Sequence, residues 1–126
     1  MKLAHVLLAT LTGLTESAIA CTAPKHNEQI RIDVRYELTD DDQFAVLIQH
    51  PKTFDGLALN QVDMTIYEGS KVLVYTLVAP VDGDRERSTV VVAGALLEQT
   101  EIRVWYGPSD AGLCPAYRSI RLRRPD

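Results

Sequence analysis

Residues 30–38 read IRIDVRYEL, a stretch in which apolar side chains take every second position and charged side chains fill the positions between. A period of two is typical of a β-strand that packs one face on a core and leaves the other in water. After the acidic turn at residues 40–42, the apolar residues Phe44, Val46 and Ile48 repeat the pattern. The stretch therefore predicts two consecutive strands that run in opposite directions.

A hairpin is expected over residues 62–77. Gly69-Ser70 is a two-residue turn with glycine at its first position, as a type II′ turn requires. This turn places the opposite charges of Glu68 and Lys71 across from each other. Counting outward from it predicts three apolar or aromatic pairs: Ile66 with Leu73, Met64 with Tyr75, and Val62 with Leu77. Because these side chains share one face, we expect both arms of the hairpin to contribute to the core.

Three further segments carry strand signals, namely residues 88–97, 102–106 and 118–122. The first is a continuous apolar run that fits a central strand, with a short helix at 93–98 as the alternative. The whole pattern predicts an all-β fold, an antiparallel β-sandwich of about seven strands and immunoglobulin-like size, with a small up-and-down β-barrel as the alternative. The Cys–Trp–Cys arrangement of true immunoglobulin domains is absent.

Residues 1–20 have the pattern of an export signal. A basic start at Met1-Lys2 precedes a mostly apolar run, and Ala18 and Ala20 are the small residues that a signal peptidase accommodates. The sequence thus predicts a signal peptide over residues 1–20 and a single domain over residues 21–126. We expect the protein to be exported, either to a periplasm or to the outside of the cell.

Cys21 and Cys114 are the only cysteines. In an oxidising compartment they predict one disulfide, and a loop of this length stabilises a domain by about 4–5 kcal/mol in the chain-entropy model. The alternative is lipidation of Cys21, because residues 18–21 resemble a bacterial lipobox; they depart from it at Ala18, where leucine is usual. Only in that case is a membrane anchor expected.

If consecutive strands alternate in direction, a position before the first strand and one between the sixth and seventh strands lie at the same end of the domain. This strand parity brings both cysteines to one end, together with the connections at residues 50–60 and 80–87. His26 and His50 are therefore secondary candidates for a metal site beside Cys114. However, no closely spaced ligand pair such as C-x-x-C or H-x-x-x-H occurs in the sequence. We expect no metal and no cofactor.

Catalytic motifs are also missing from the sequence. The serines lack a Gly-x-Ser-x-Gly frame, and no glycine-rich phosphate loop occurs. The formal net charge of −4 argues against general nucleic-acid binding. We expect a protein that is neither an enzyme nor a nucleic-acid binder.

The outward faces of the last two strands carry the most suggestive surface. Arginine, tryptophan and tyrosine are common anchors of protein interfaces. If the two strands are neighbours, such residues interleave on one face; the candidate binding surface consists of Arg103, Trp105, Tyr117, Arg121 and Arg123. Because Trp105 points outward, we expect its replacement by alanine to lower the free energy of unfolding by less than about 1.5 kcal/mol, against roughly 3–5 kcal/mol for a buried tryptophan.

These observations favour an exported, non-enzymatic β-sandwich binding module that contacts a protein or a cell-envelope polymer. One alternative is a carrier of a small ligand or metal that uses the loop end near Cys114. Another is a hydrolase inhibitor that presents residues 107–115 as a wedge. The oligomeric state does not follow from the sequence.

Overall fold

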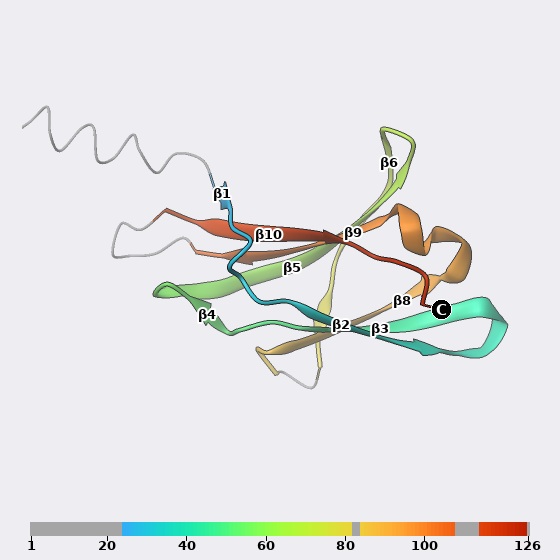
Figure 1. Ribbon diagram of the computed structural model, residues 1–126, viewed down its shortest axis with the longest axis horizontal. Coiled ribbons are helices and arrows are strands. Elements are labelled where there is room, and N and C mark those ends of the chain that lie inside the picture. The colour runs from blue at the N-terminus through green and yellow to red at the C-terminus, as the bar shows by residue number, and fades with distance from the viewer. Residues whose placement is uncertain (1–23, 82–83, 108–113, 126) are drawn as a thin grey trace, which may run out of the picture.

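A computed structural model describes residues 24–81, 84–107 and 114–125 as two facing β-sheets (Figure 1). The large sheet has the order β1-β10-β9-β5-β4, and β6 also pairs with β5. The small sheet has the order β2-β3-β8-β7. The strands of the large sheet are β1 (Lys25–His26), β4 (Thr53–Phe54), β5 (Leu57–Glu68), β6 (Lys71–Leu77), β9 (Thr100–Tyr106) and β10 (Ala116–Arg121). Those of the small sheet are β2 (Asp33–Leu38), β3 (Gln43–Gln49), β7 (Ala79–Pro80) and β8 (Arg87–Ala93).

The prediction of an all-β, sandwich-like fold is confirmed. In the described part of the chain, seven strands have six or more residues and correspond to the predicted segments, while β1, β4 and β7 have two residues each. Neighbouring strands are antiparallel except β1 and β10, which run parallel. Two short 3-10 helices, η1 (Asp40–Asp42) and η2 (Gly94–Gln99), connect strands.

The core lies between the sheets and follows from the period-two patterns. On β3 the alternate residues Phe44, Val46 and Ile48 are buried, and on β9 Ile102 and Val104 are fully buried. Residues between them point outward and remain partly accessible. Each aliphatic side chain that is fully buried in this way contributes about 1.5–3 kcal/mol to stability.

The hairpin of β5 and β6 departs from its predicted register. Glu68 does lie opposite Lys71, but the pairing shifts between Ile66 and Tyr67, so Ile66 lies opposite Val74 and not Leu73. A β-bulge of this kind places one extra residue in a strand and exchanges the faces of the residues beyond it. The predicted pairs of Met64 with Tyr75 and Val62 with Leu77 are wrong for the same reason.

The second arm of this hairpin is also not part of the core. All seven residues of β6 are exposed, because the arm projects away from the small sheet and no strand of the described residues lies opposite it (Figure 1). After Leu77 the chain leaves the large sheet and enters the small sheet as β7. The predicted burial of Leu73 and Tyr75 is therefore wrong.

Two further boundaries differ from the predictions. The apolar run at 88–97 is not a single strand, since β8 ends at Ala93 and the 3-10 helix η2 follows, close to the predicted helical alternative. After β10, Leu122 is buried and the chain crosses toward the small sheet, where the Arg123 backbone N–H donates to Tyr36 Oη at 3.0 Å. Arg124 then forms an ion pair with Asp42 at 2.9 Å.

Candidate functional site

The predicted surface on the last two strands is largely assembled on the outer face of the large sheet. β9 and β10 are neighbours, with Tyr117 opposite Trp105 and Ser119 opposite Arg103. Arg121 lies one pair further along, opposite Glu101. Arg123 is not brought to this face by a strand, because β10 ends at Arg121.

The aromatic rings on this face pack against one another. Trp105 and Tyr117 are stacked, with ring centroids 4.6 Å apart and planes at 28°. His26 meets the Tyr117 ring edge-on at 5.3 Å. The stack occupies one face of each ring, and His26 adds a second contact to Tyr117.

Beneath this stack lies a carboxylate that the sequence analysis missed. Asp63 stands on an outward position of β5 yet is only 1% exposed. Its Oδ2 atom accepts hydrogen bonds from Trp105 Nε1 at 2.7 Å, from the Tyr75 hydroxyl at 3.2 Å and from Gln61 Nε2 at 3.2 Å. Desolvation and the Asp63 charge raise the pKa of the Tyr75 phenol. The network therefore joins β9, β5 and β6 around one buried charge.

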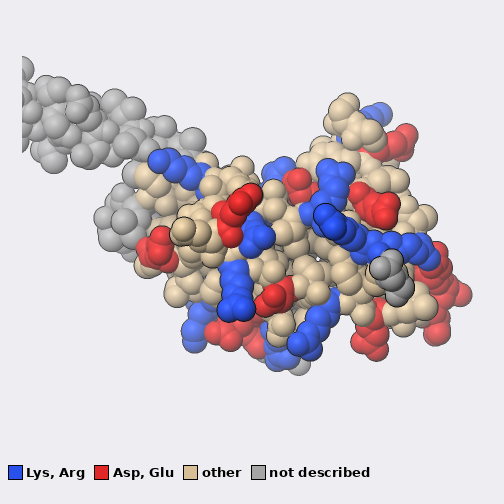
Figure 2. All heavy atoms as spheres, viewed as in Figure 1, with Lys and Arg blue, Asp and Glu red and all other residues tan. Residues whose placement is uncertain are grey.

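The two arginines of this face also have intramolecular partners. Arg103 binds Glu101 at 2.8 Å and the Tyr67 hydroxyl at 3.3 Å. The Arg121 guanidinium lies over the Tyr67 ring, 5.6 Å from its centroid. Figure 2 shows that acidic and basic side chains are interspersed over the visible face of the molecule. The face is thus stabilised by its own contacts.

The exposed apolar side chains gather instead on β6. Val74 and Tyr75 point to opposite faces of this strand, yet they are 41% and 55% exposed. We use the term β6 edge for the apolar residues of this strand that are at least 41% exposed: Val72, Leu73, Val74, Tyr75 and Leu77. Among the described strands, β6 pairs only with β5, so its other side has no strand. Natural edge strands are usually protected by charges, prolines or short length, whereas β6 carries one charge, Lys71, at its start.

The backbone of the β6 edge has a defined set of outward hydrogen-bonding groups. Val78 N–H donates to the Val62 carbonyl at 2.9 Å, which marks this couple as a hydrogen-bonded pair. In an antiparallel ladder such pairs alternate with non-hydrogen-bonded ones. Leu77 and Tyr75, which lie opposite Asp63 and Thr65, therefore direct their N–H and C=O groups away from β5. An added strand would bond to these groups.

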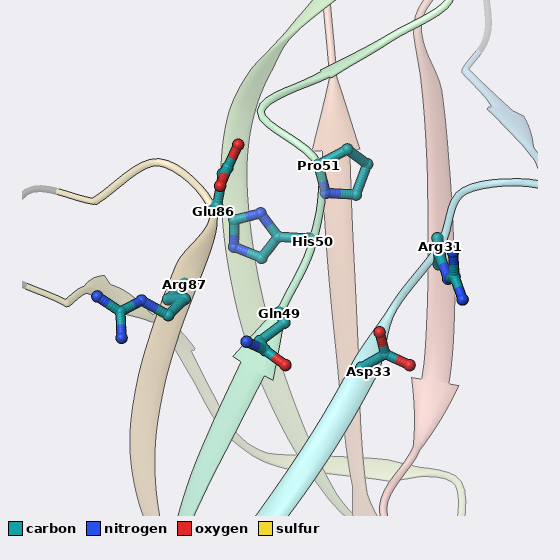
Figure 3. A pocket seen from close by; sticks show the side chains of 7 residues that line it. All are labelled: Arg31, Asp33, Gln49, His50, Pro51, Glu86 and Arg87. Atoms are coloured by element: carbon teal, nitrogen blue, oxygen red, sulfur yellow. The ribbon is translucent and has the colours of Figure 1, made fainter.

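A separate cavity of about 370 Å³ lies at the end of the small sheet around His50 (Figure 3). His50 is 5% exposed, and its Nε2 lies 3.0 Å from the Ser88 hydroxyl. Burial lowers the pKa of His50, although the Pro51 backbone and the acidic side chains of Asp84 and Glu86 partly offset this effect. Because Ser88 is itself buried, its hydroxyl is not accessible to a substrate from this side.

The candidates for a metal site do not form one cluster. His26 lies on β1 of the large sheet, whereas His50 follows β3 of the small sheet. Within residues 24–81, 84–107 and 114–125, no group of three or more His, Cys, Asp or Glu side chains is placed to hold a metal ion.

The loop end near Cys114 is only partly described. Lys25 N–H donates to the Pro115 carbonyl at 3.0 Å, so the N-terminal segment runs beside Cys114. Cys21 lies outside the described residues, and both its disulfide and its lipidation stay predictions. Residues 108–113 of the inhibitor wedge also lie outside them, and so does the signal peptide. No helix among the described residues is long and apolar enough to span a membrane.

Comparison with known proteins adds no relative: no family model, curated protein or solved structure matches the chain. The candidate functional site is therefore argued from geometry alone, and the β6 edge is its strongest feature.

Proposed function

We propose that the chain is an exported, non-enzymatic binding module that holds a protein partner by adding an extended segment of that partner to β6. The observation that carries the proposal is the β6 edge, which is apolar on both faces and has no described strand on the side away from β5. In strand addition, backbone hydrogen bonds supply affinity and alternate side chains supply specificity. The outward groups of Tyr75 and Leu77 suit the first requirement, and the exposed apolar side chains suit the second.

A protein partner is favoured over an envelope polymer by the state of the aromatic face. Polymer binding through stacked sugars needs free ring faces, and the mutual stack of Trp105 and Tyr117 takes one face of each ring. The basic groups that would attract an anionic polymer are engaged as well, since Arg103 binds Glu101 and Arg121 covers Tyr67. The β6 edge offers few charges and is better suited to a peptide backbone.

Two variants at one position test the proposal. Tyr75→Ala and Tyr75→Pro both remove the ring and its hydroxyl, but only Tyr75→Pro also removes the outward N–H. Because this N–H does not bond to β5, proline at an edge position leaves the β5–β6 ladder intact. The exported protein is used to capture partners from envelope extract, and the affinity of each variant for the captured protein is measured.

We expect Tyr75→Pro to bind about tenfold more weakly than Tyr75→Ala, which corresponds to about 1.4 kcal/mol. Val91→Lys is the control for changes of an exposed apolar side chain, since Val91 is 56% exposed on the small sheet. It should bind like the wild type, whereas Val74→Lys on the β6 edge should lose affinity. Equal affinities of the alanine and proline variants would exclude strand addition at β6.

A further inference from the structure

The large sheet has a gap in its edge next to the point where β6 ends. On this side of β5, β4 pairs with Leu57 and Ala58, and β6 pairs with residues 63–68. Of residues 59–62, only 60 and 61 have no described backbone partner on this side. The Leu59 N–H donates to the Lys52 carbonyl at 2.9 Å, and the Val78 N–H donates to the Val62 carbonyl at 2.9 Å before the chain turns away to form β7 of the small sheet. An extended segment added along the β6 edge and continued past Leu77 would arrive at this gap.

A cavity of about 380 Å³ occupies the gap, between the edges of the two sheets. Its apolar lining comes from both sheets and from the crossing segment, namely Leu59, Val62, Leu77, Val78 and Pro80. Leu77 belongs both to this lining and to the β6 edge, so the two surfaces are continuous. A pocket of this size and lining suits a large aliphatic or aromatic side chain.

Two charged residues line the cavity, Asp84 and Arg85, and only Asp84 has an ion-pair partner among the described residues. Asp84 is engaged, since its carboxylate accepts from the Arg87 side chain at 2.9 Å and from the Glu86 backbone N–H at 2.7 Å. Arg85 lines the same cavity, is exposed, and has no ion-pair partner among the described residues. A ligand group beside the apolar anchor would therefore meet a guanidinium that has no ion-pair partner in the described part of the chain.

We propose that this cavity is the anchor site for the segment that pairs with β6: it takes one large apolar side chain, and Arg85 receives a carboxylate on the neighbouring residue. The inference rests on the proposed function, because β6 must present the segment to the cavity. The occupant is thus an extended stretch of a partner protein, apolar and β-branched along β6, with a leucine or phenylalanine next to an acidic residue at one end.

The test uses fluorescein-labelled peptides in which valine and threonine alternate and a Leu-Glu pair stands at one end. One peptide carries the pair at its N-terminal end and one at its C-terminal end, because the added strand can run in either direction relative to β6. Each has a counterpart with alanine in place of leucine and another with glutamine in place of glutamate. Fluorescence anisotropy gives their affinities for the exported protein.

We expect one of the two peptides to bind at least tenfold more tightly than its alanine counterpart. This ratio corresponds to a difference of about 1.4 kcal/mol in binding free energy. Asn60→Trp fills the gap from an exposed position of β5 and should reduce this ratio to near one without weakening the alanine peptide. Val91→Trp, on the exposed face of the small sheet, should leave the ratio unchanged. Arg85→Gln should weaken the glutamate peptide about threefold and leave the glutamine peptide unchanged.

The outcomes separate this inference from the proposed function. Three results would overturn the anchor site. The leucine and alanine peptides bind with nearly equal affinity, Asn60→Trp leaves the ratio of their affinities unchanged, or neither leucine peptide binds. If Tyr75→Pro still weakens partner capture in that case, strand addition at β6 stands without the anchor. A dimer in sedimentation equilibrium that Tyr75→Pro dissociates would make a second copy the occupant of β6 and would overturn the inference as well.

Discussion

Replacement of Trp105 should destabilise the protein more than its outward position suggests. Trp105 Nε1 makes the shortest hydrogen bond to Asp63, at 2.7 Å, and this carboxylate is 1% exposed. Loss of a hydrogen bond to a buried charge costs about 1.5–3 kcal/mol. Trp105→Phe keeps a ring to stack on Tyr117 and removes only the donor, so we expect this cost for it. Trp105→Ala also loses the stack, worth about 0.5–1.5 kcal/mol more.

A double-mutant cycle isolates the interaction. The free energy of unfolding is measured by urea denaturation for Trp105→Phe, Asp63→Ala and the double variant; far-UV circular dichroism is the signal, because Trp105 is the only tryptophan. We expect a coupling energy of at least about 1 kcal/mol. The control cycle pairs Trp105→Phe with Val91→Ala on the other sheet and should be additive. Additivity within about 0.5 kcal/mol in the Asp63 cycle would refute the role assigned to this hydrogen bond.

Three further predictions concern the loop end and the termini. Burial lowers the pKa of His50 in the folded protein below its value in the unfolded chain. As the pH falls through about 6.5, the unfolded state therefore binds more protons than the folded state. The free energy of unfolding should therefore fall from pH 7 toward pH 5, and His50→Gln should flatten this slope in urea titrations. Tyr106→Phe removes a buried hydroxyl that donates to a backbone carbonyl at 2.5 Å; we expect a loss of about 1 kcal/mol, and an unchanged urea midpoint would contradict this. The intact mass of the exported protein should correspond to cleavage after residue 20 and a Cys21–Cys114 disulfide, two hydrogens lighter than the dithiol, whereas an acyl mass gain would establish the lipoprotein.

The sequence predicts the fold well where a strand's burial depends on its own pattern. Residues 44–48 alternate, and the structure buries Val46 and Ile48 as that alternation requires. On residues 30–38 the alternation is weaker: the strand begins at Asp33, Val34 and Tyr36 are half-buried, and Leu38 is 63% exposed. The same pattern fails on β6, since burial there also depends on whether the small sheet extends beneath the arm. The sequence of residues 71–77 carries no information about how far the other sheet extends. An apolar edge strand and a core strand can therefore have the same sequence pattern.

The candidate site shows a similar limit. The alternation of side chains places Trp105 and Tyr117 on the outward sides of their own strands, and their pairing follows because the two strands are neighbours. The contact of Trp105 with Asp63 spans 42 positions and depends on β5 being the next strand of the large sheet, an order that parity does not give. The sequence therefore does not indicate that Asp63, at an outward position of β5, is covered by large neighbours.

The contacts between the two ends of the described chain have a consequence for the timing of folding. Asn27 N–H donates to the Tyr117 carbonyl at 2.8 Å, and Arg118 donates to the Ile30 carbonyl, 88 positions earlier, at 2.6 Å. Contacts between such distant positions form late, because the loop that they close is long. A chain that emerges N-terminus first from a ribosome or a membrane channel cannot complete the large sheet until β10 has emerged. Until then β1 has no partner strand and β9 has only β5 beside it, so this side of the large sheet stays incomplete until nearly the whole chain has emerged.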